Sequence, residues 1–246
     1  MRNNFKIFAI TLFFVSTFTF LINGCSNIYS IEGSGNSVTL NRKINNFSGL
    51  NISGGLSIHI SSTQPDSILT IICDDNFPNH IKTFFEGDVL IIDYEDDLSP
   101  VIPIKIILPD FRLQSLDASG AIKFTYDTSI VYDSKSFSID VSGANTISLP
   151  LNVSNIEIDV SGANKISLNG FTNSLHIEAS GANTINAENL ESNSVFVDAS
   201  GANSFKLNVT EEMELDLSGA NSVKYRGNPK RFKQDVSGAT KISKLE

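Results

Sequence analysis

The sequence contains few residues of the kinds that build reactive or metal-binding sites. Among its 246 residues are two cysteines, three histidines and no tryptophan. The histidines His59, His80 and His176 lack the HxxH or HExxH spacing that places two imidazoles on one metal ion. The nucleophile motif GxSxG, the P-loop and the dinucleotide-binding glycine pattern are also missing. We therefore predict no metal site, no cofactor and no catalytic residue.

Basic residues are scarce as well. The chain has 18 lysines and arginines against 27 aspartates and glutamates, a formal net charge of −9. An anionic surface repels the phosphate backbone of nucleic acids. We therefore expect no nucleic-acid partner.

Residues 1–24 have the pattern of an export signal. Arg2 and Lys6 precede an uncharged apolar run, Ile7–Ile22, which is shorter than the about 20 residues that a membrane-spanning helix needs. The run ends before Gly24-Cys25, which resembles the lipobox of bacterial lipoproteins; the alternative is an ordinary secretory signal with an incidental cysteine. The resemblance implies that Cys25 is acylated, becomes the mature N-terminus and anchors the chain in the cell envelope. Ser26 after it favours the outer membrane.

Cys73 would then have no partner for an intramolecular disulfide bond. It lies in the apolar stretch LTIICDD. We expect a buried thiol rather than a reactive one.

A short word is repeated through the second half of the chain. DVSGAN stands at Asp140–Asn145 and again at Asp159–Asn164, and close variants follow. Neighbouring copies are 18 to 23 residues apart, most often 19. A period of this size is the signature of a solenoid. The glycines of the word are Gly120, Gly143, Gly162, Gly181, Gly201, Gly219 and Gly238.

Apolar residues alternate with polar ones on both sides of each word, as in strands with one buried face. Each unit therefore predicts a strand ending near Asp-x-Ser, a bend at Ser-Gly, a second strand of about five residues and an outer polar connection of variable length. Because so short a unit cannot bury its own apolar face, it must stack on its neighbours. We predict an all-β fold, a right-handed parallel β-helix with one strand path and about 19 residues per coil. Left-handed acyltransferase helices need three apolar hexads per coil and calcium-binding nonapeptides need paired glycines, and neither pattern is present.

The repeated word is predicted to be architectural. Glycine allows a backbone conformation or close approach that a Cβ would block, and the serine hydroxyl beside it can bond the backbone at the bend. The asparagines should stack into a ladder of side-chain amides, formed by Asn145, Asn164, Asn183, Asn203 and Asn221.

A column of acids accompanies the ladder, and it is the candidate cation or ligand face. Adjacent carboxylates would lie about 5 Å apart, with a repulsion on the order of 1 kcal/mol in water. We expect backbone and hydroxyl hydrogen bonds to offset it, with bound cations as the second possibility and catalysis as the third. The column comprises Asp140, Asp159, Glu178, Asp198 and Asp216, with Asp117 and Asp235 at its ends.

The rest of the chain repeats less clearly. We assign 25–39 to an anchor and linker and 40–246 to one domain, irregular over 40–116 and coiled over 117–246. Gly35 and Gly54 are also 19 residues apart, which hints that the coil period begins early. Gln234 and Lys244 stand where other coils have apolar residues, which predicts a polar end to the stack.

Two stretches carry a family resemblance. Phe47–Gly54 fits F-x-x-[LI]-x-I-S-G, and Ile106–Ala121 reads IILPDFRLQSLDASGA before the SGAN coils begin. Together they resemble the bacterial family called putative auto-transporter adhesin, head GIN domain, over about residues 40–246. The resemblance implies a β-helix like that of pectin lyases without their catalytic residues, and a role in adhesion.

We therefore expect a non-catalytic, lipid-anchored envelope protein whose rigid β-helical surface binds an unknown glycan or protein. The alternative is a β-helical polysaccharide lyase or hydrolase. An enzyme would concentrate its acids and bases on one or two coils beside a groove, whereas the acids here recur in every coil.

Overall fold

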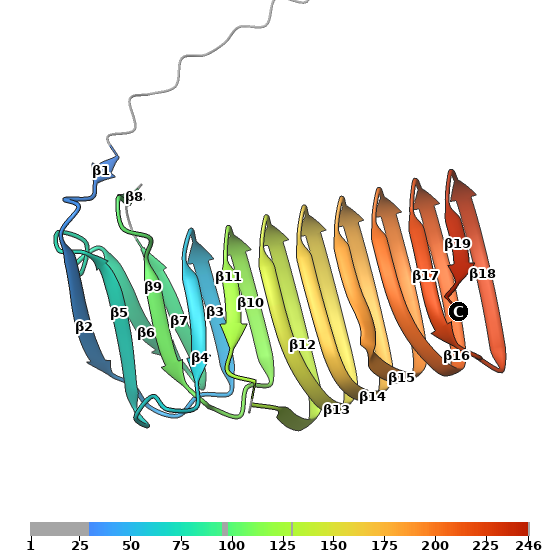
Figure 1. The fold of residues 1–246 in the computed structure, drawn as a ribbon, viewed down its shortest axis with the longest axis horizontal. Helices are drawn as coiled ribbons and strands as arrows, with labels where there is room; N and C mark the ends of the chain where they lie inside the picture. Colours follow the sequence, from blue (N-terminus) through green and yellow to red (C-terminus); the bar gives the residue numbers. More distant parts are fainter. Residues whose placement is uncertain (1–29, 95–97, 129, 246) are drawn as a thin grey trace, which may run out of the picture.

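The computed structural model describes residues 30–94, 98–128 and 130–245, and these form an elongated stack of strands (Figure 1). No helix occurs in the described residues, so none of them belongs to a helix long and apolar enough to cross a membrane. The strands are wound into a parallel β-solenoid of about seven turns, about 19 residues apart. The predicted all-β solenoid is confirmed.

In the residues that the structure describes, nine strands precede the regular part of the stack. They are β1 (Ile31–Glu32), β2 (Ser37–Lys43), β3 (Gly49–Gly54), β4 (Ser57–Ser61), β5 (Ile68–Asp74), β6 (Ile81–Glu86), β7 (Val89–Tyr94), β8 (Leu98–Ser99) and β9 (Lys105–Pro109).

Ten strands follow. They are β10 (Ser115–Gly120), β11 (Lys123–Tyr126), β12 (Tyr132–Gly143), β13 (Thr146–Gly162), β14 (Lys165–Gly181), β15 (Thr184–Gly201), β16 (Ser204–Gly219), β17 (Ser222–Gly227), β18 (Arg231–Gly238) and β19 (Lys241–Lys244).

The strands make two facing layers that run the length of the molecule. The first sheet contains, in spatial order, β6, β7, β3, β10, the later parts of β12 to β16, and β18. The second contains β2, β5, β9, β4, β11, the early parts of β13 to β16, β17 and β19. Each coil contributes one strand to each sheet and turns between them at two corners.

The coils stack in register, because identical letters of the repeat pair with one another. Asp140 pairs with Asp159, and Gly143 with Gly162. Alternate side chains therefore point between the sheets and form continuous buried rows. One such row contains Ile139, Ile158, Ile177, Val197 and Leu215.

The polar connections differ from their predicted form as outer loops. Whereas 228–230 between β17 and β18 lie outside any strand, those in β13 to β16 lie inside long strands that bend from the second sheet to the first, at the lower edge of Figure 1. Leu151, Val153 and Leu190 are buried there, and Asn152 pairs with Phe171 on the next coil. The reason is that alternation continues through this lower corner, with its inward positions filled by apolar or hydroxyl side chains.

The coil pattern begins earlier than the regular repeat. Ser53 and Gly54 pair with Ser119 and Gly120, so β3 and β4 form a coil of the same kind. Residues between β4 and β10 then leave the stack and build its N-terminal end. Gly35 lies outside the coil pattern, because it precedes β2, which pairs antiparallel with β5.

The N-terminal cap, defined as β2, β5, β6, β7 and β9, is largely antiparallel. Its two layers are tied together by Arg42, whose guanidinium donates to Ile81 O at 2.6 Å, Thr83 Oγ1 at 3.0 Å and Pro78 O at 2.7 Å. Cys73 is fully buried here, as predicted, and burial raises the pKa of its thiol. An un-ionised, inaccessible thiol is unreactive.

The C-terminal end has no comparable cover among the described residues. Every residue of β18 is exposed, and Phe232 and Val236 remain 43% and 38% accessible although their positions face inward in the register. Gln234 and Lys244 occupy the inward positions of Leu215 and Tyr225 in the last coil. The stack therefore ends in a partly polar layer, open to solvent.

Candidate functional site

The glycine corner, where Ser-Gly-Ala joins the two sheets, is held by backbone contacts. Gly143, Gly162 and Gly181 have φ values of 102°, 99° and 101°, a region that L side chains rarely adopt. A Cβ on Gly162 would overlap Gly143 O, because Ala163 N donates to that carbonyl at 2.7 Å. The same holds along the column, so all seven glycines of the repeated word are required by shape: Gly120, Gly143, Gly162, Gly181, Gly201, Gly219 and Gly238.

The five asparagines form one buried column beside the glycines. Asn164 Oδ1 accepts from the backbone N of Asn145 at 2.9 Å and from its Nδ2 at 2.8 Å. Its own Nδ2 donates to Ser161 O at 2.6 Å and to Asn183 Oδ1 at 3.0 Å. Each amide thus bonds its own corner and the next coil. The column comprises Asn145, Asn164, Asn183, Asn203 and Asn221, each no more than 2% exposed.

The corner serines have a different role from the one predicted. Their backbone carbonyls, rather than their hydroxyls, complete the corner, as in the bond from Asn183 Nδ2 to Ser180 O at 2.7 Å. The asparagine reaches this carbonyl because it lies three residues further along the chain, inside the bend.

The acids align on the outer face of the first sheet. Asp140, Asp159, Glu178, Asp198 and Asp216 pair strand to strand, and Asp117 and Asp235 extend the row. Hydrogen bonds reach the column near one end, from Asn51 Nδ2 to Asp117 Oδ2 at 3.0 Å, and at Glu178, from His176 Nε2 at 3.3 Å. In the described residues, the carboxylates of Asp140, Asp159, Asp198 and Asp216 accept no hydrogen bond, contrary to the expected bonding at the corner.

Repulsion around Asp159 is therefore not offset by a hydrogen bond, whereas Lys233 interacts favourably with Asp216 and Asp235 at the C-terminal end of the column. Desolvation, then Asp140 and Glu178, raise the pKa of Asp159. Desolvation, then Asp140, raise the pKa of Asp117. Within the described chain, no group of three or more His, Cys, Asp or Glu side chains has a geometry that could hold a metal ion. The row is an anionic face with a hollow of about 400 Å³ over its middle, lined by Asp140, Asp159 and Glu178 together with Glu157 and His176.

A second feature lies where the N-terminal cap meets the coils. We call it the junction groove, two hollows of about 530 and 390 Å³ that share Asp110, Phe111 and Arg112. Its wall on the cap side contains Asn46, Phe47, Ser48, Asp66, Asp88 and Gln114, and its wall on the coil side contains Val131, Tyr132 and Asp133.

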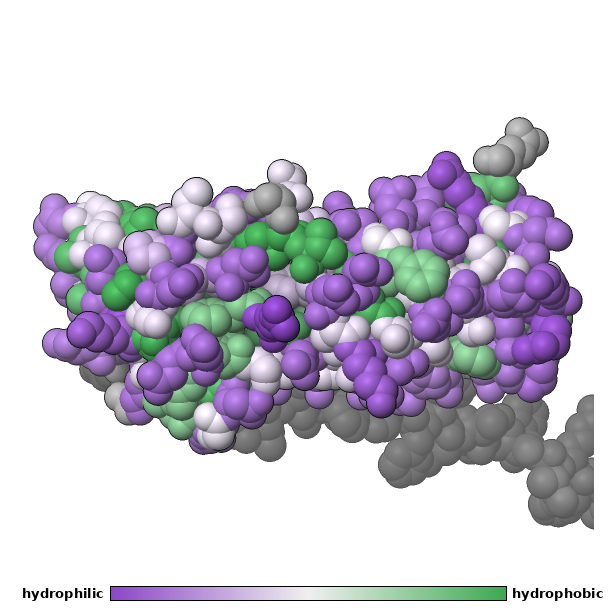
Figure 2. All heavy atoms as spheres, turned by 90° about the horizontal axis from the view of Figure 1, so that it is seen from below, coloured by the Kyte–Doolittle hydropathy of each residue, from purple (hydrophilic) through white to green (hydrophobic). Residues whose placement is uncertain are grey.

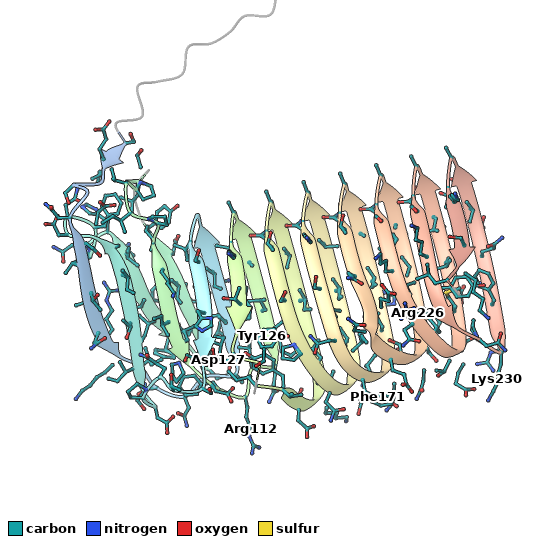
Figure 3. All side chains as sticks on the ribbon, viewed as in Figure 1. Arg112, Tyr126, Asp127, Phe171, Arg226 and Lys230 are labelled. Carbon is teal, nitrogen blue, oxygen red and sulfur yellow. The ribbon has the colours of Figure 1, made fainter. Side chains whose placement is uncertain are left out.

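The groove follows from the change of architecture at this point. The segment between β9 and β10 crosses from the cap to the stack, and its residues 110–114 belong to no strand. Phe111 is half-buried against Phe47, with ring centroids 4.5 Å apart and planes tilted by 52°. Arg112 projects away from the strands at the lower edge, as Figure 3 shows. Seen from below, hydrophobic patches gather toward the N-terminal half of this face, while the C-terminal part is mostly hydrophilic (Figure 2).

Two carboxyls of the groove have shifted pKa values. The hydroxyl of Ser48 donates to Asp88, which lowers the pKa of that carboxyl. Partial burial raises the pKa of Asp110. Tyr132 is 3% exposed, and its buried hydroxyl is without a hydrogen-bond partner among the described residues. The ring of Phe111 lies in an open hollow among carboxylates, side-chain amides and one guanidinium.

The sequence did not single out the groove or the buried Asp74. The Asp74-Asp75 pair has the composition of a solvated turn, yet Asp74 is fully buried. Its carboxylate accepts backbone N–H groups from Gly35 at 2.7 Å, Val101 at 3.1 Å and Ile102 at 3.0 Å. A carboxylate directly after an apolar strand was the only available signal. The predicted lipidation residue, Cys25, lies outside the described residues.

Comparison with known proteins gives a family and a fold. A family model described as putative auto-transporter adhesin, head GIN domain, matches residues 46–229. The crystal structure of a putative adhesin from Bacteroides fragilis has a TM-score of 0.79 at 20% identity, covering 88% of this chain and 100% of that one. A putative lipid binding protein from Parabacteroides distasonis has a TM-score of 0.69 at 18% identity, with coverages of 88% and 100%. A putative adhesin from Parabacteroides merdae has a TM-score of 0.67 at 16% identity, with coverages of 88% and 99%.

These structures share the fold of the chain at low identity. No curated protein matches it.

Proposed function

Because the chain belongs to the family described as putative auto-transporter adhesin, head GIN domain, we propose that it is a non-catalytic binding protein of the cell envelope whose ligand occupies the junction groove. The coil stack serves as a rigid support, since backbone pairing fixes each coil to the next and the asparagine column links the five coils that carry it. A site on such a support loses little conformational freedom when it binds.

The observation that carries the proposal is the composition of the groove. Phe111 offers an apolar ring, and Gln114, Asn46 and Arg112 offer planar hydrogen-bonding groups around it. A sugar ring has the same two-sided chemistry, with apolar C–H faces and pairs of hydroxyls at its rim. Four carboxylates against one guanidinium disfavour an anionic ligand. A neutral saccharide is therefore the ligand class that fits.

The test is a glycan array probed with the chain from Ser26 onward, followed by calorimetry on the glycans that bind. Phe111→Ala should weaken binding at least about tenfold, as the loss of a central aromatic contact does, and Arg112→Ala should weaken it less. Phe171→Ala is the matched control, because Phe171 is an exposed phenylalanine at the same lower edge but outside the groove (Figure 3). Glycan binding that Phe111→Ala leaves unchanged would refute the assignment to the groove. Release of a cleaved saccharide would favour the polysaccharide lyase or hydrolase instead.

The proposal includes the anchor. The pattern of residues 1–25 supports acylation of Cys25, which would hold the solenoid at the outer membrane. Cys25→Ala should release the protein from the membrane fraction while leaving its β-rich circular dichroism unchanged. Mass spectrometry of the wild-type N-terminus gives the independent readout, and an unmodified Cys25 thiol in membrane-free protein would contradict the anchor.

A further inference from the structure

The open C-terminal end presents a free strand edge. β18 pairs with β16 on one side and with no described strand on the other. An edge of this kind is a template for pairing with another chain. Phe232 and Val236 leave apolar surface uncovered beside it, around a hollow of about 380 Å³ at the end of the core.

The register shows which backbone groups face outward. In an earlier coil Ser138 N donates back to Gln114 O at 2.9 Å. Lys233 has the same place in the last coil, through the pairings that run from Ser138 to Glu214. Because successive residues of a strand point their N–H and C=O groups to opposite sides, Lys233 and Asp235 bond β16. The backbone N–H and C=O groups of Phe232, Gln234 and Val236 point to the free edge.

We propose that this edge pairs with the same edge of a second copy of the chain, antiparallel and centred on Gln234, to form a two-fold symmetric dimer. In that register Gln234 pairs with its own symmetry mate, and Phe232 pairs with Val236. All three positions have outward-facing backbone groups, so the hydrogen bonds of the ladder are complete.

Charge selects this register over its neighbours. Centring on Gln234 places Lys233 opposite Asp235 of the second copy, twice over by symmetry. Shifting the centre to Lys233 or to Asp235 would set that residue against its own mate, and like charges directly opposite destabilise a pair. Asp235 accepts no hydrogen bond from any described residue of its own chain, so its carboxylate is available. The Lys233 ammonium already bonds Glu214 on β16, so in the dimer it would lie between that carboxylate and Asp235 of the second copy.

The inner face of the pair is equally self-complementary. Phe232 would cover Val236 of the second copy on each side of the axis, extending the core across the interface. Gln234, which occupies a position that is apolar in earlier coils, could bond its mate through its amide. β19 is left out of the ladder, since Lys241 and Lys244 would bring like charges together. The interface is short, so the dimer should be reversible and concentration-dependent.

Sedimentation velocity on the chain from Ser26 onward, which contains all the described structure, tests the proposal over a wide concentration range. Lys233→Asp opposes acid to acid across the axis, and Asp235→Lys opposes base to base, so each variant alone should associate at least about tenfold more weakly. An equimolar mixture of the two should associate like the wild type, because the heterodimer restores both opposite-charge pairs. Rescue in the mixture also shows that both variants are folded.

A proline substitution examines the backbone separately. Gln234→Pro removes an N–H that β16 does not use, so the monomer should keep its circular dichroism while the dimer is lost. Gln234→Ala keeps the N–H and is the matched control, expected to retain dimerisation. A wild-type chain that stays monomeric at the highest concentration would overturn the proposal, and so would a dimer that survives Gln234→Pro or a mixture that fails to restore association.

Discussion

The N-terminal cap and the coil stack bury similar apolar residues but are held together in different ways. In the stack, one set of contacts recurs from coil to coil: a glycine against the carbonyl of the preceding glycine and, in the five coils that carry it, an asparagine bonded to its neighbour in the column. In the cap, the strands are mostly antiparallel, and single side chains make contacts that occur nowhere else in the described chain. Arg42 joins two layers and Asp74 gathers three backbone N–H groups.

This difference indicates how each part should respond to a destabilising substitution. A solenoid is stabilised by interactions between neighbouring repeats, so a damaged coil affects mainly the coils next to it. A cap depends on contacts that have no second copy. The destabilisation caused by a substitution should therefore extend over different distances in the two parts. Hydrogen exchange can measure how far the loss of protection extends from the substituted residue.

The largest effect should come from Gly162→Ala in the middle of the stack. The new Cβ would overlap Gly143 O and require a side chain at φ 99°, which together should lower the free energy of unfolding by about 4 kcal/mol. Chemical denaturation measures the loss. Gly87→Ala is the control, because φ is 64° there but no atom lies within 4 Å of the added Cβ, so about 1 kcal/mol is expected. Equal losses in the two variants would contradict the close contact between coils.

Asp74→Asn is the corresponding change in the cap. The amide cannot accept all three backbone N–H groups, and its NH₂ would face donors in a fully buried site, so a loss of about 3 kcal/mol is expected. Hydrogen exchange should show faster exchange across β2, β5 and β9, with β14 and β15 unaffected. Asp75→Asn, at the neighbouring exposed carboxylate, is the control. Uniform acceleration through the whole chain would show that the cap and the stack unfold as one unit.

Asn164→Ala should cost somewhat less, about 2 kcal/mol, because it leaves the backbone N–H and the amide of Asn145 without their buried acceptor. The amides of β12 to β14 near the glycine corner should lose protection first. Asn193→Ala removes a half-buried amide that donates to Asn173 Oδ1 and accepts from Thr210 Oγ1 on the two neighbouring coils, and should lower stability by about 1 kcal/mol or less. If both variants lost the same stability, burial of the column would not be what makes it important.

The same contrast explains what could be predicted. The contacts of Gly162 and Asn164 could be predicted, because residues that are adjacent in the stack are also adjacent in an alignment of the repeat. The role of Gly54 was partly hidden, because the chain inserts the cap between it and Gly120, its partner in the column. Arg42 and Asp74 bond partners that are distant in sequence and never repeated, so nothing in the local pattern identifies them. The junction groove arises where the two architectures meet, and neither pattern alone contains it.

The smallest expected effect is the change in stability when an acid of the column is neutralised. Its sign distinguishes a row of uncompensated carboxylates from a cation-binding site. Desolvation, with Asp140 and Glu178, raises the pKa of Asp159 in the folded chain above its unfolded value. The charged carboxylate therefore opposes folding at neutral pH. This cost disappears as the pH falls through the folded pKa. Asp159→Asn should therefore stabilise the protein slightly at pH 7, by about 0.5 kcal/mol or less at so exposed a site, with a smaller difference near pH 4. Glu191→Gln, between the uncharged Phe171 and Asn208, is the control and should change little at either pH.

If the column instead binds calcium, the wild type should melt at a higher temperature when calcium is added. Asp159→Asn would then reduce stability in calcium rather than raise it, and that reversal of sign would contradict the uncompensated row.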